Sequence, residues 1–538
     1  MRMYQTLLTV CMASSLAGCS TLEEVGDKAG SAEQSGRIRN VIVMIGDGMG
    51  PQQVGLLDSY IRYSSNPVLD SSAFDRMASE GVVGIARTEA NQVLVVDSAA
   101  SATQFASGRM AGSEMIGADF QGNRAQSMLE VAQGKGKAVG LVSDTRLTHA
   151  TPAAYAAHQQ HRSLENEIAV EMLETGADVM LSGGIRHWLP QGVNEEGSAL
   201  RAELEELTGG TMRLSSRRRD DRNLLAEASE AGYDLSFNRT DLAASHGDRL
   251  LGLYSYSGML DGIAHTQAGD GAERVQPSLT EMTAKALSVL EKDEDGFFLM
   301  VEGGQIDWAA HNNDAGTMLH EMIKFSDAID VVLDWMKGRD DTLLVVSADH
   351  ETGGFGFAYS RNDLPEGEPL DGDVFQGDDY KPNWNFGRVE TLDRLYEQKL
   401  SYDGIFSQFD SLEESQQTPE NLRMIVNANT QFPITLAQAR RVLETELNVY
   451  YVADHGTLSA ERFPLMHERK AFYVYGSGIR KNILASVVAE QSNAVWASDN
   501  HSSTPVYLFA MGPEDVTDAF KGILHTTEWA NEIIDVLD

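Results

Sequence analysis

The chain has 538 residues, with 42 Lys and Arg against 80 Asp and Glu, which gives a formal net charge of −38. This charge argues against nucleic acid or an anionic membrane surface as an electrostatic partner. With 42% hydrophobic residues, 49 Gly and 13 Pro, the composition is that of a globular protein with a large core. Only 12 of the 42 basic residues are Lys. Because salt screens the self-repulsion of so acidic a surface, we predict a halophilic protein.

The first 18 residues are predicted to form a signal peptide of the lipoprotein type. Arg2 precedes a short apolar stretch, residues 7–16, which is too short to span a bilayer. The stretch ends in Leu-Ala-Gly-Cys, which resembles the bacterial lipobox, so Cys19 would become the lipid-modified first residue of the mature chain. We therefore expect export to the periplasm and a membrane anchor at Cys19. The alternative is an ordinary secretory signal in which Cys19 is incidental.

Residues 19–36 are small, polar and charged, and are expected to form a tether. From residue 38 on, short apolar runs alternate with helical segments. Buried strands are expected at 38–45, 137–142, 179–181, 297–301 and 342–346, and helices at 279–290 and 315–336. Strands without polar alternation that are separated by helices predict an α/β domain over 37–538, with a mostly parallel central sheet covered on both faces.

Two segments interrupt this alternation. Residues 185–250 are charged and rich in Arg, and we interpret them as a smaller insertion with a solvated face. Residues 355–495 are rich in Asp, Asn, Gly and aromatic residues, with a helical stretch near 434–446. A segment of this length is expected to be an inserted subdomain, because connections without structure of their own are rarely so long.

Acidic and imidazole side chains follow three of the predicted strands. Asp47 follows the first, Glu302 follows the run FFLMV, and Asp349 and His350 follow the run TLLVV. A single Asp after a strand most often caps a helix. Several such residues at successive strand ends, where ligands of parallel sheets collect, instead indicate a site for Zn²⁺ and Mg²⁺.

Asp307 and His311 are four residues apart. On a helix this spacing places both side chains on one face, as a shared metal ion requires. The nucleophile candidate is Ser98, which follows the apolar run VLVV and begins a helical segment of small residues. A helix N-terminus favours a bound anion. The alternative, in which Asp97 or Ser98 is only the N-cap, is compatible with catalysis.

Six segments resemble, in order, the motifs of the alkaline phosphatase family: VIVMIGDGMG, VDSAASAT, DTRLTHATPAAYAAHQQHR, EGGQIDWAAHNND, VVSADHETGG and SDNHSSTPVYLFAMGP. They cover the chain from about residue 40 to about residue 530. The long insertion further resembles that of the marine, Vibrio-type members, in which it forms a crown over a homodimer. The resemblance implies a three-layer α/β sandwich, a crown at about 355–495 and a homodimer.

The same resemblance implies two zinc sites and one magnesium site. One Zn²⁺ would be bound by Asp307, His311 and His501, and the second by Asp47, Asp349 and His350, with Ser98 facing it. Asp47 would also contact a Mg²⁺ bound by Thr151 and Glu302. His501 is preferred to His455 as the third imidazole because it directly precedes the apolar strand VYLFAMG.

Three further positions follow from the family pattern. Arg162 matches the arginine that binds the phosphoryl oxygens, a task for which a planar guanidinium is suited. His149 stands where some members have an Asp and others a His near the Mg²⁺. We expect it to contact the metal ligands and not the ion itself. Trp308 stands where members differ, and its role is left open.

The implied activity is hydrolysis of a broad range of small phosphate monoesters through a phosphoserine at Ser98, with release of inorganic phosphate. One alternative is a phosphodiesterase or sulfatase of the same superfamily, although the Ser98 segment lacks the C/S-x-P-x-R motif of sulfatases. The other is a non-catalytic acidic surface lipoprotein that binds divalent cations. That alternative leaves Ser98 and Arg162 unexplained.

Overall fold

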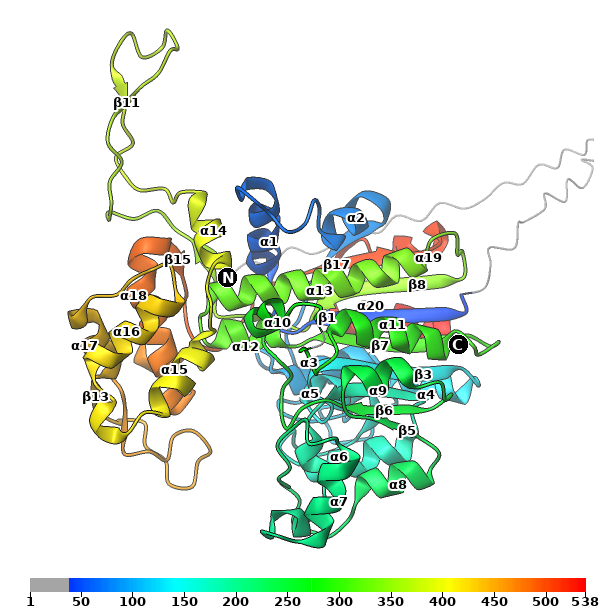
Figure 1. Cartoon of the computed structure of the whole chain (residues 1–538). Coiled ribbons are helices and arrows are strands. Elements are labelled where there is room, and N and C mark those ends of the chain that lie inside the picture. Colours follow the sequence, from blue (N-terminus) through cyan, green and yellow to red (C-terminus); the bar gives the residue numbers. More distant parts are fainter. Residues whose placement is uncertain (1–37, 272) are drawn as a thin grey trace, which may run out of the picture. The chain divides into compact units, whose positions relative to one another are not determined.

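The central element is a ten-stranded sheet, seen in a computed structural model that describes residues 38–271 and 273–538 (Figure 1). The predicted signal peptide and tether lie outside the described residues. In spatial order the strands are β18 (Gly522–His525), β2 (Val82–Arg87), β17 (Val506–Met511), β8 (Thr342–Ala348), β1 (Asn40–Gly46), β7 (Phe297–Gly303), β3 (Ala138–Arg146), β4 (Val179–Gly183), β6 (Leu250–Leu253) and β5 (Asp234–Ser236).

Every neighbouring pair in this sheet is parallel except the two pairs that β17 makes with β2 and β8. All residues of β1, β7 and β8 are buried, as expected of strands with both faces covered. In the register, Val43 pairs with Met300 on one side and with Val345 on the other. The predicted α/β class and the five predicted strands are therefore confirmed.

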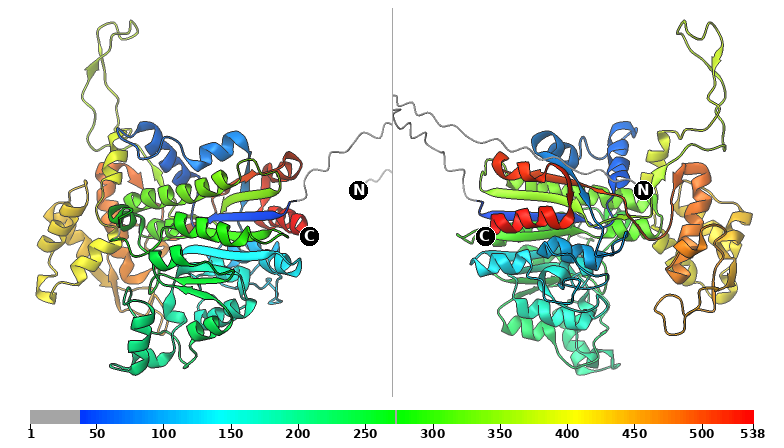
Figure 2. Two further views of the ribbon diagram at one scale, coloured as in Figure 1. Left: turned by 45° about the vertical axis from the view of Figure 1, so that its right-hand side comes forward. Right: turned by 180° about the vertical axis from the view of Figure 1, so that it is seen from behind.

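Helices cover both faces of the sheet (Figure 2). The layer on one face is built around α13 (Ala315–Trp335) and contains α1 (Pro51–Tyr63), α2 (Ala73–Glu80), α10 (Gly262–Ala268) and α11 (Leu279–Leu290). The layer on the other face contains α3 (Ser98–Ser107), α4 (Met128–Gly134), α5 (Ala150–Ala156), α6 (Glu165–Thr175) and α20 (Thr526–Leu537). The predicted helices are α11, which has the predicted bounds, and α13, which ends one residue earlier.

The segment 185–250 contains α7 (Ala199–Leu207), α8 (Leu224–Glu230) and α9 (Arg239–Ala244), together with the edge strand β5. Strand β5 pairs in parallel with β6 and so extends the central sheet. No sequence pattern indicated this strand, because it has three residues and one of them is an exposed Asp. Part of the predicted insertion therefore belongs to the sheet.

The segment 355–495 contains five α-helices: α14 (Glu390–Tyr396), α15 (Tyr402–Asp410), α16 (Pro419–Asn429), α17 (Leu436–Leu443) and α18 (Ile479–Ser492). Helix α14 packs against α1 and α13, whereas α15 to α18 pack mainly against one another. The predicted helical stretch near 434–446 is α17. Between β10 (Gly356–Phe357) and α14, the short strands β11 (Glu368–Pro369) and β12 (Asp379–Tyr380) form an extended hairpin (Figure 1).

Short elements complete the described chain. They are β9 (Glu351–Thr352), β13 (Thr445–Leu447), β14 (Arg462–Pro464), β15 (Ala494–Val495), β16 (His501–Ser502), α12 (Gln305–His311), α19 (Glu514–Thr517) and six short 3₁₀ turns. Within residues 38–271 and 273–538, no helix is long and apolar enough to cross a membrane. Pairing of β16 with β9 matters for function, because it brings His501 beside Thr352, two residues after His350.

Candidate active site

Four neighbouring strands, β8, β1, β7 and β3, end at the same edge of the sheet. Asp349 follows β8, Asp47 follows β1, and Glu302 is the second-to-last residue of β7. All three side chains have no solvent-exposed surface. Parallel pairing therefore brings the predicted strand-end residues into one buried crevice, at the position where α/β sheets bind ligands.

The first cluster consists of Asp47, Asp349 and His350, whose ligand atoms all lie within 4.8 Å of one another. Asp349 Oδ1 accepts hydrogen bonds from the backbone N–H groups of Gly48, at 3.0 Å, and His350, at 2.9 Å. Its Oδ2 lies 3.1 Å from His350 Nε2. Both carboxylate oxygens of Asp47 lack a hydrogen-bond partner in the described part of the chain. Burial, together with the charge of Asp349, raises the pKa of Asp47 well above its usual range. A bound cation would relieve this repulsion.

The second cluster consists of Asp307, His311 and His501. His311 Nε2 lies 3.1 Å from Asp307 Oδ2 and 3.3 Å from His501 Nε2. The Nδ1 atoms donate to backbone carbonyls, that of His311 to Asp499 at 2.6 Å and that of His501 to Val96 at 2.7 Å. With Nδ1 bonded to a carbonyl, Nε2 is the nitrogen atom that each ring presents to the other, and its lone pair is available to a cation whenever the ring is neutral. Two facing lone pairs beside a carboxylate form a ligand set suited to Zn²⁺.

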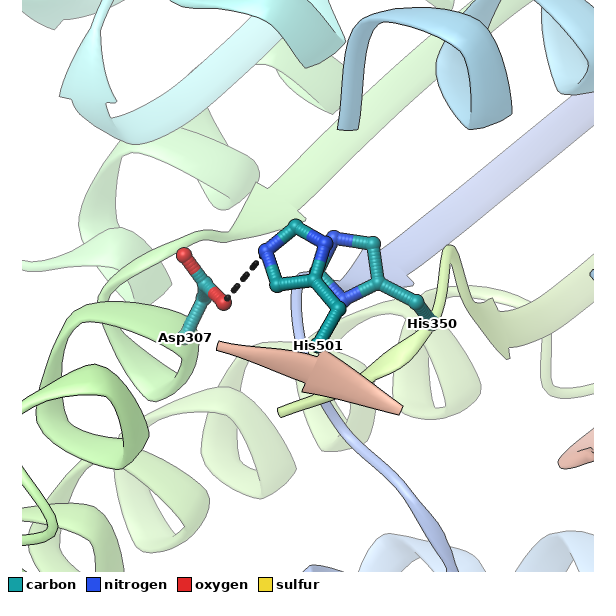
Figure 3. Close-up of side chains that lie close together, drawn as sticks. All are labelled: Asp307, His350 and His501. Carbon is teal, nitrogen blue, oxygen red and sulfur yellow. Dashed lines mark ion pairs between the residues drawn. The ribbon is translucent and has the colours of Figure 1, made fainter. Parts of the chain in front are cut away.

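The two clusters meet at His350. Its ring stacks on that of His501 with centroids 3.4 Å apart, and Asp307, His350 and His501 also place ligand atoms within 4.8 Å of one another (Figure 3). The competing histidine, His455, is exposed, and its Nδ1 accepts from the backbone N–H of Thr457. The structure thus brings His501 into the site and leaves His455 at the surface.

The third cluster surrounds Glu302. Its Oε2 accepts from the hydroxyl of Thr145 at 3.1 Å and from that of Ser143, whereas Oε1 has no hydrogen-bond partner among the described residues. The hydroxyl of Thr151 is buried and equally without a partner there. Burial raises the pKa of Glu302 to about 7. With Asp47, these oxygen atoms form the hard donor set that Mg²⁺ prefers.

His149 lies beside this third cluster, with Nδ1 3.9 Å from Glu302 Oε1. Burial lowers its pKa well below the usual range, so the ring is neutral. Arg162 donates to its Nε2 at 3.3 Å, which leaves the single ring proton on Nδ1. His149 also places a ring nitrogen within 4.8 Å of ligand atoms of Asp47 and Glu302. Its predicted place beside the metal ligands, without direct contact to the cation, stays a prediction.

Ser98 is the first residue of α3, and its Oγ lies 3.3 Å from His350 Nε2. Asp97 is the N-cap: its Oδ2 accepts from the backbone N–H of Ala99 at 3.1 Å and lies 3.4 Å from Arg162 Nη1. Asp97 therefore both begins the helix and orients the arginine. The sequence suggested only the capping role, because the contact with Arg162 spans 65 residues.

A cavity of about 560 Å³ opens onto these clusters. The predicted residues that line it are Ser98, His149, Arg162, Asp307, His311 and His501. Trp308, whose role the sequence left open, is part of the wall and lies 5.8 Å from the Arg146 guanidinium. The segment 355–495 adds Tyr475 and Lys481, which no sequence motif indicated. Tyr475 packs edge-on against the His311 ring at 4.7 Å.

The doubly covered parallel sheet, the buried ligand clusters at its carboxyl edge and the serine at a helix N-terminus define a metal-binding α/β enzyme. The family model "Alkaline phosphatase" matches residues 38–402. The chain belongs to the alkaline phosphatase family and is a phosphate monoester hydrolase, as its sequence motifs predicted.

Known proteins resemble the chain over most of its length. Alkaline phosphatase 4 of Bacillus subtilis (strain 168) is 28% identical over 98% of this chain and 95% of its own. Alkaline phosphatase 3 of the same organism is 35% identical over 65% of this chain and 70% of its own. The crystal structure of a cold-active alkaline phosphatase from the psychrophile Shewanella sp. is 25% identical and covers 93% of this chain and 100% of that one, with a TM-score of 0.65. The Thermus thermophilus alkaline phosphatase, 23% identical, shares the fold with a TM-score of 0.71 over 95% of both chains.

Proposed function

We propose that the protein hydrolyses small phosphate monoesters in two displacements at phosphorus, through a phosphoserine at Ser98. The observation that carries this proposal is the position of Ser98 Oγ, at the N-terminus of α3 and 3.3 Å from His350 Nε2, where the first two ligand clusters meet. In the first displacement Oγ forms the bond to phosphorus, and the alcohol departs from the opposite side. In the second, water attacks phosphorus, Ser98 is restored and inorganic phosphate leaves.

The residues around Ser98 have separate tasks. The guanidinium of Arg162, oriented by Asp97, binds two non-bridging phosphoryl oxygens and offsets the charge that they carry in the transition state. Ser98 itself lies at the N-terminus of α3, a position that favours a bound anion. Trp308 and Tyr475 form part of the cavity wall and exclude water from the bound ester. The open cavity, of about 560 Å³, is consistent with a broad range of leaving groups.

The donor sets support two Zn²⁺ and one Mg²⁺. Asp307, His311 and His501 would hold one Zn²⁺, and Asp47, Asp349 and His350 the other. Asp47, Thr151 and Glu302 offer only oxygen atoms and would hold Mg²⁺. When bound, these cations supply electrostatic stabilisation of the phosphoryl oxygens and lower the pKa of the serine hydroxyl.

Our proposals for location and assembly follow from the sequence. Cys19, the proposed lipid anchor of an exported periplasmic protein, lies outside the described residues. We propose a homodimer in which the segment 355–495 takes part as a crown. Exposed apolar side chains on this segment support that idea, among them Val374, Phe386 and Tyr359, with exposed fractions of 85%, 65% and 63%. Molar mass in solution, measured with and without the hairpin, tests the assembly.

The mechanism predicts that Ser98→Ala abolishes turnover while leaving the metal clusters in place. We expect a fall of at least about 1,000-fold in kcat on 4-nitrophenyl phosphate, because the nucleophile is lost. Zinc and magnesium content, measured on the same sample, should match the wild type. A wild-type rate in this variant would refute the serine mechanism. Faster turnover of bis(4-nitrophenyl) phosphate by the wild type would instead favour the phosphodiesterase alternative.

A further inference from the structure

An arginine cluster forms where the segment 185–250 meets the end of β3. Arg186, Arg213 and Arg217, from that segment, lie around Tyr256, and Arg146, the last residue of β3, completes the cluster. The guanidinium carbons of Arg186 and Arg213 lie 5.6 Å and 4.5 Å from the centroid of the Tyr256 ring. The backbone N–H of Arg217 donates to the Arg186 carbonyl at 2.8 Å, and this bond holds the two loop segments together. Arg213 and Arg217 are exposed to solvent.

The arginine cluster is continuous with the wall of the active-site cavity. Arg146 lines that cavity together with Ser98 and Arg162. The carboxylate of Glu165 links Arg146, at 2.8 Å, to Arg186, at 3.7 Å. Gly258, two residues after Tyr256, packs so closely against the ring of the cavity-lining Trp308 that a Cβ atom at this position would overlap the ring. This contact is a second connection between the cluster and the cavity wall. The cluster thus begins at the edge of the cavity and extends away from it.

Ion pairing separates the two exposed arginines of the cluster, Arg213 and Arg217, from their neighbours Arg218 and Arg222. Arg218 is paired with Asp220, and Arg222 with Glu227, both at 2.6 Å. In the described part of the chain, neither Arg213 nor Arg217 has a carboxylate partner within 4.0 Å. The one acid within the cluster is Glu165, which is shared by two arginines.

Two titratable groups lie beside these arginines, and their pKa shifts complete the charge balance of the cluster. Burial lowers the pKa of His187, beside Glu165, to about 4, so this ring adds no charge. Burial raises the pKa of Tyr256, but a hydrogen bond from Arg217 and the charges of Arg217, Arg213 and Arg186 together outweigh it, and the pKa falls below its usual value. In a chain of net charge −38, four guanidinium groups with one carboxylate are a local reversal of sign beside the reaction site.

We propose that the arginine cluster binds additional phosphate groups of the substrate, so that the preferred substrates are small molecules that carry several phosphates. A guanidinium offers paired N–H donors that match the oxygens of a phosphate. One phosphate of such a molecule occupies the site at Ser98 while another lies against Arg146 and the exposed arginines. The proposal rests on the proposed function, because the bond that breaks is the same ester bond at Ser98.

The test compares myo-inositol 1-phosphate with myo-inositol hexakisphosphate, which share a ring and differ in the number of phosphates. We measure KM for each, or the inhibition constant against 4-nitrophenyl phosphate. For the wild type at low salt we expect the hexakisphosphate value to be about 10-fold lower or more, because charge-assisted hydrogen bonds are gained. In Arg213→Gln/Arg217→Gln this preference should fall about 10-fold, with turnover of 4-nitrophenyl phosphate unchanged.

A matched control is Arg201→Gln/Arg222→Gln, which removes the same charge from ion-paired arginines of the same segment. It should retain the wild-type preference. An equal loss of preference in the control would show a general charge effect and overturn the proposal. A wild type without preference, or a preference that survives in Arg213→Gln/Arg217→Gln, would also overturn it. Continued hydrolysis of 4-nitrophenyl phosphate in those cases would leave the proposed function intact.

Discussion

At the scale of single residues, the site depends on side chains that satisfy two partners at once. The two carboxylate oxygens of Asp97 accept from the backbone N–H groups of Ala99 and Glu114, at 3.1 Å and 2.9 Å, and Oδ2 also faces Arg162. Its helix-capping contact thus fixes the carboxylate that orients the arginine. His501 is held in the same way, since the Nδ1 bond to Val96 leaves Nε2 free to face His311.

His501→Ala and His455→Ala provide a matched pair of histidine variants. We expect His501→Ala to lose about one Zn²⁺ per chain and at least about 100-fold in kcat/KM, because a nitrogen ligand disappears from the second cluster. His455 is exposed, and its Nδ1 accepts a hydrogen bond from Thr457, which belongs to none of the ligand clusters. His455→Ala should therefore behave as the wild type. Metal analysis and steady-state kinetics on both variants decide the assignment, and the opposite pattern would reverse it.

At the scale of elements, the turn between β7 and α12 connects two ligand clusters, because Glu302 precedes it and Asp307 follows it. The backbone N–H of Gly304 in this turn donates to Asp144 Oδ1 at 2.7 Å. Asp144 Oδ2 in turn lies 3.0 Å from Lys324 Nζ, on the buried face of α13. The long helix therefore supports the turn through one ion pair.

Lys324→Met tests this support. It would leave the buried carboxylates of Asp144 and Glu321 without their cation, at 3.0 Å and 2.5 Å in the wild type. We expect metal loss to a chelator to become about 10-fold faster, because supports of metal ligands typically contribute this much to affinity. Lys324→Arg should restore part of the effect.

The control for that experiment is Lys337→Met, because Lys337 follows the same helix but is exposed and paired with Asp334. Its metal-loss rate should equal that of the wild type. A lower Tm for Lys324→Met with an unchanged rate of metal loss would show that the ion pair only stabilises the fold.

At the scale of the whole molecule, charge is distributed unevenly. With 80 acidic against 42 basic residues, the acids exceed the bases by 38. The acids of the three ligand clusters are buried and would be neutralised by cations, so they account for few of these. The surplus acids repel one another, and this repulsion is what the predicted halophily would relieve.

We therefore expect the thermal stability of the metal-loaded protein to rise with sodium chloride. Between 0.1 M and 1 M salt the Debye length falls from about 10 Å to about 3 Å, so most of the surface repulsion is screened in this interval. Calorimetry across that range should show a Tm that climbs and then levels off. A Tm that stays flat or falls would contradict the interpretation of the acidity as an adaptation to salt.

Local patterns in the sequence determined the ligand candidates and the buried strands. The apolar runs at 297–301 and 342–346 fill β7 and β8, and each is followed by a potential ligand. The spacing of Asp307 and His311 places both on one face of α12. Such features are visible because strand burial and helix periodicity depend on a few neighbouring residues.

Only the tertiary structure decided how these pieces meet. The order β8, β1, β7 and β3 unites strand ends that are far apart in the sequence, such as Gly46 and Ala348, and the pairing of β16 with β9 carries His501 into the site. Lys481 and Tyr475 line the cavity although no motif contains them. The arginine cluster likewise exists only because the fold brings Arg213 and Arg186 to one tyrosine. Contacts of this kind are set by packing between distant segments, which no window of local sequence contains.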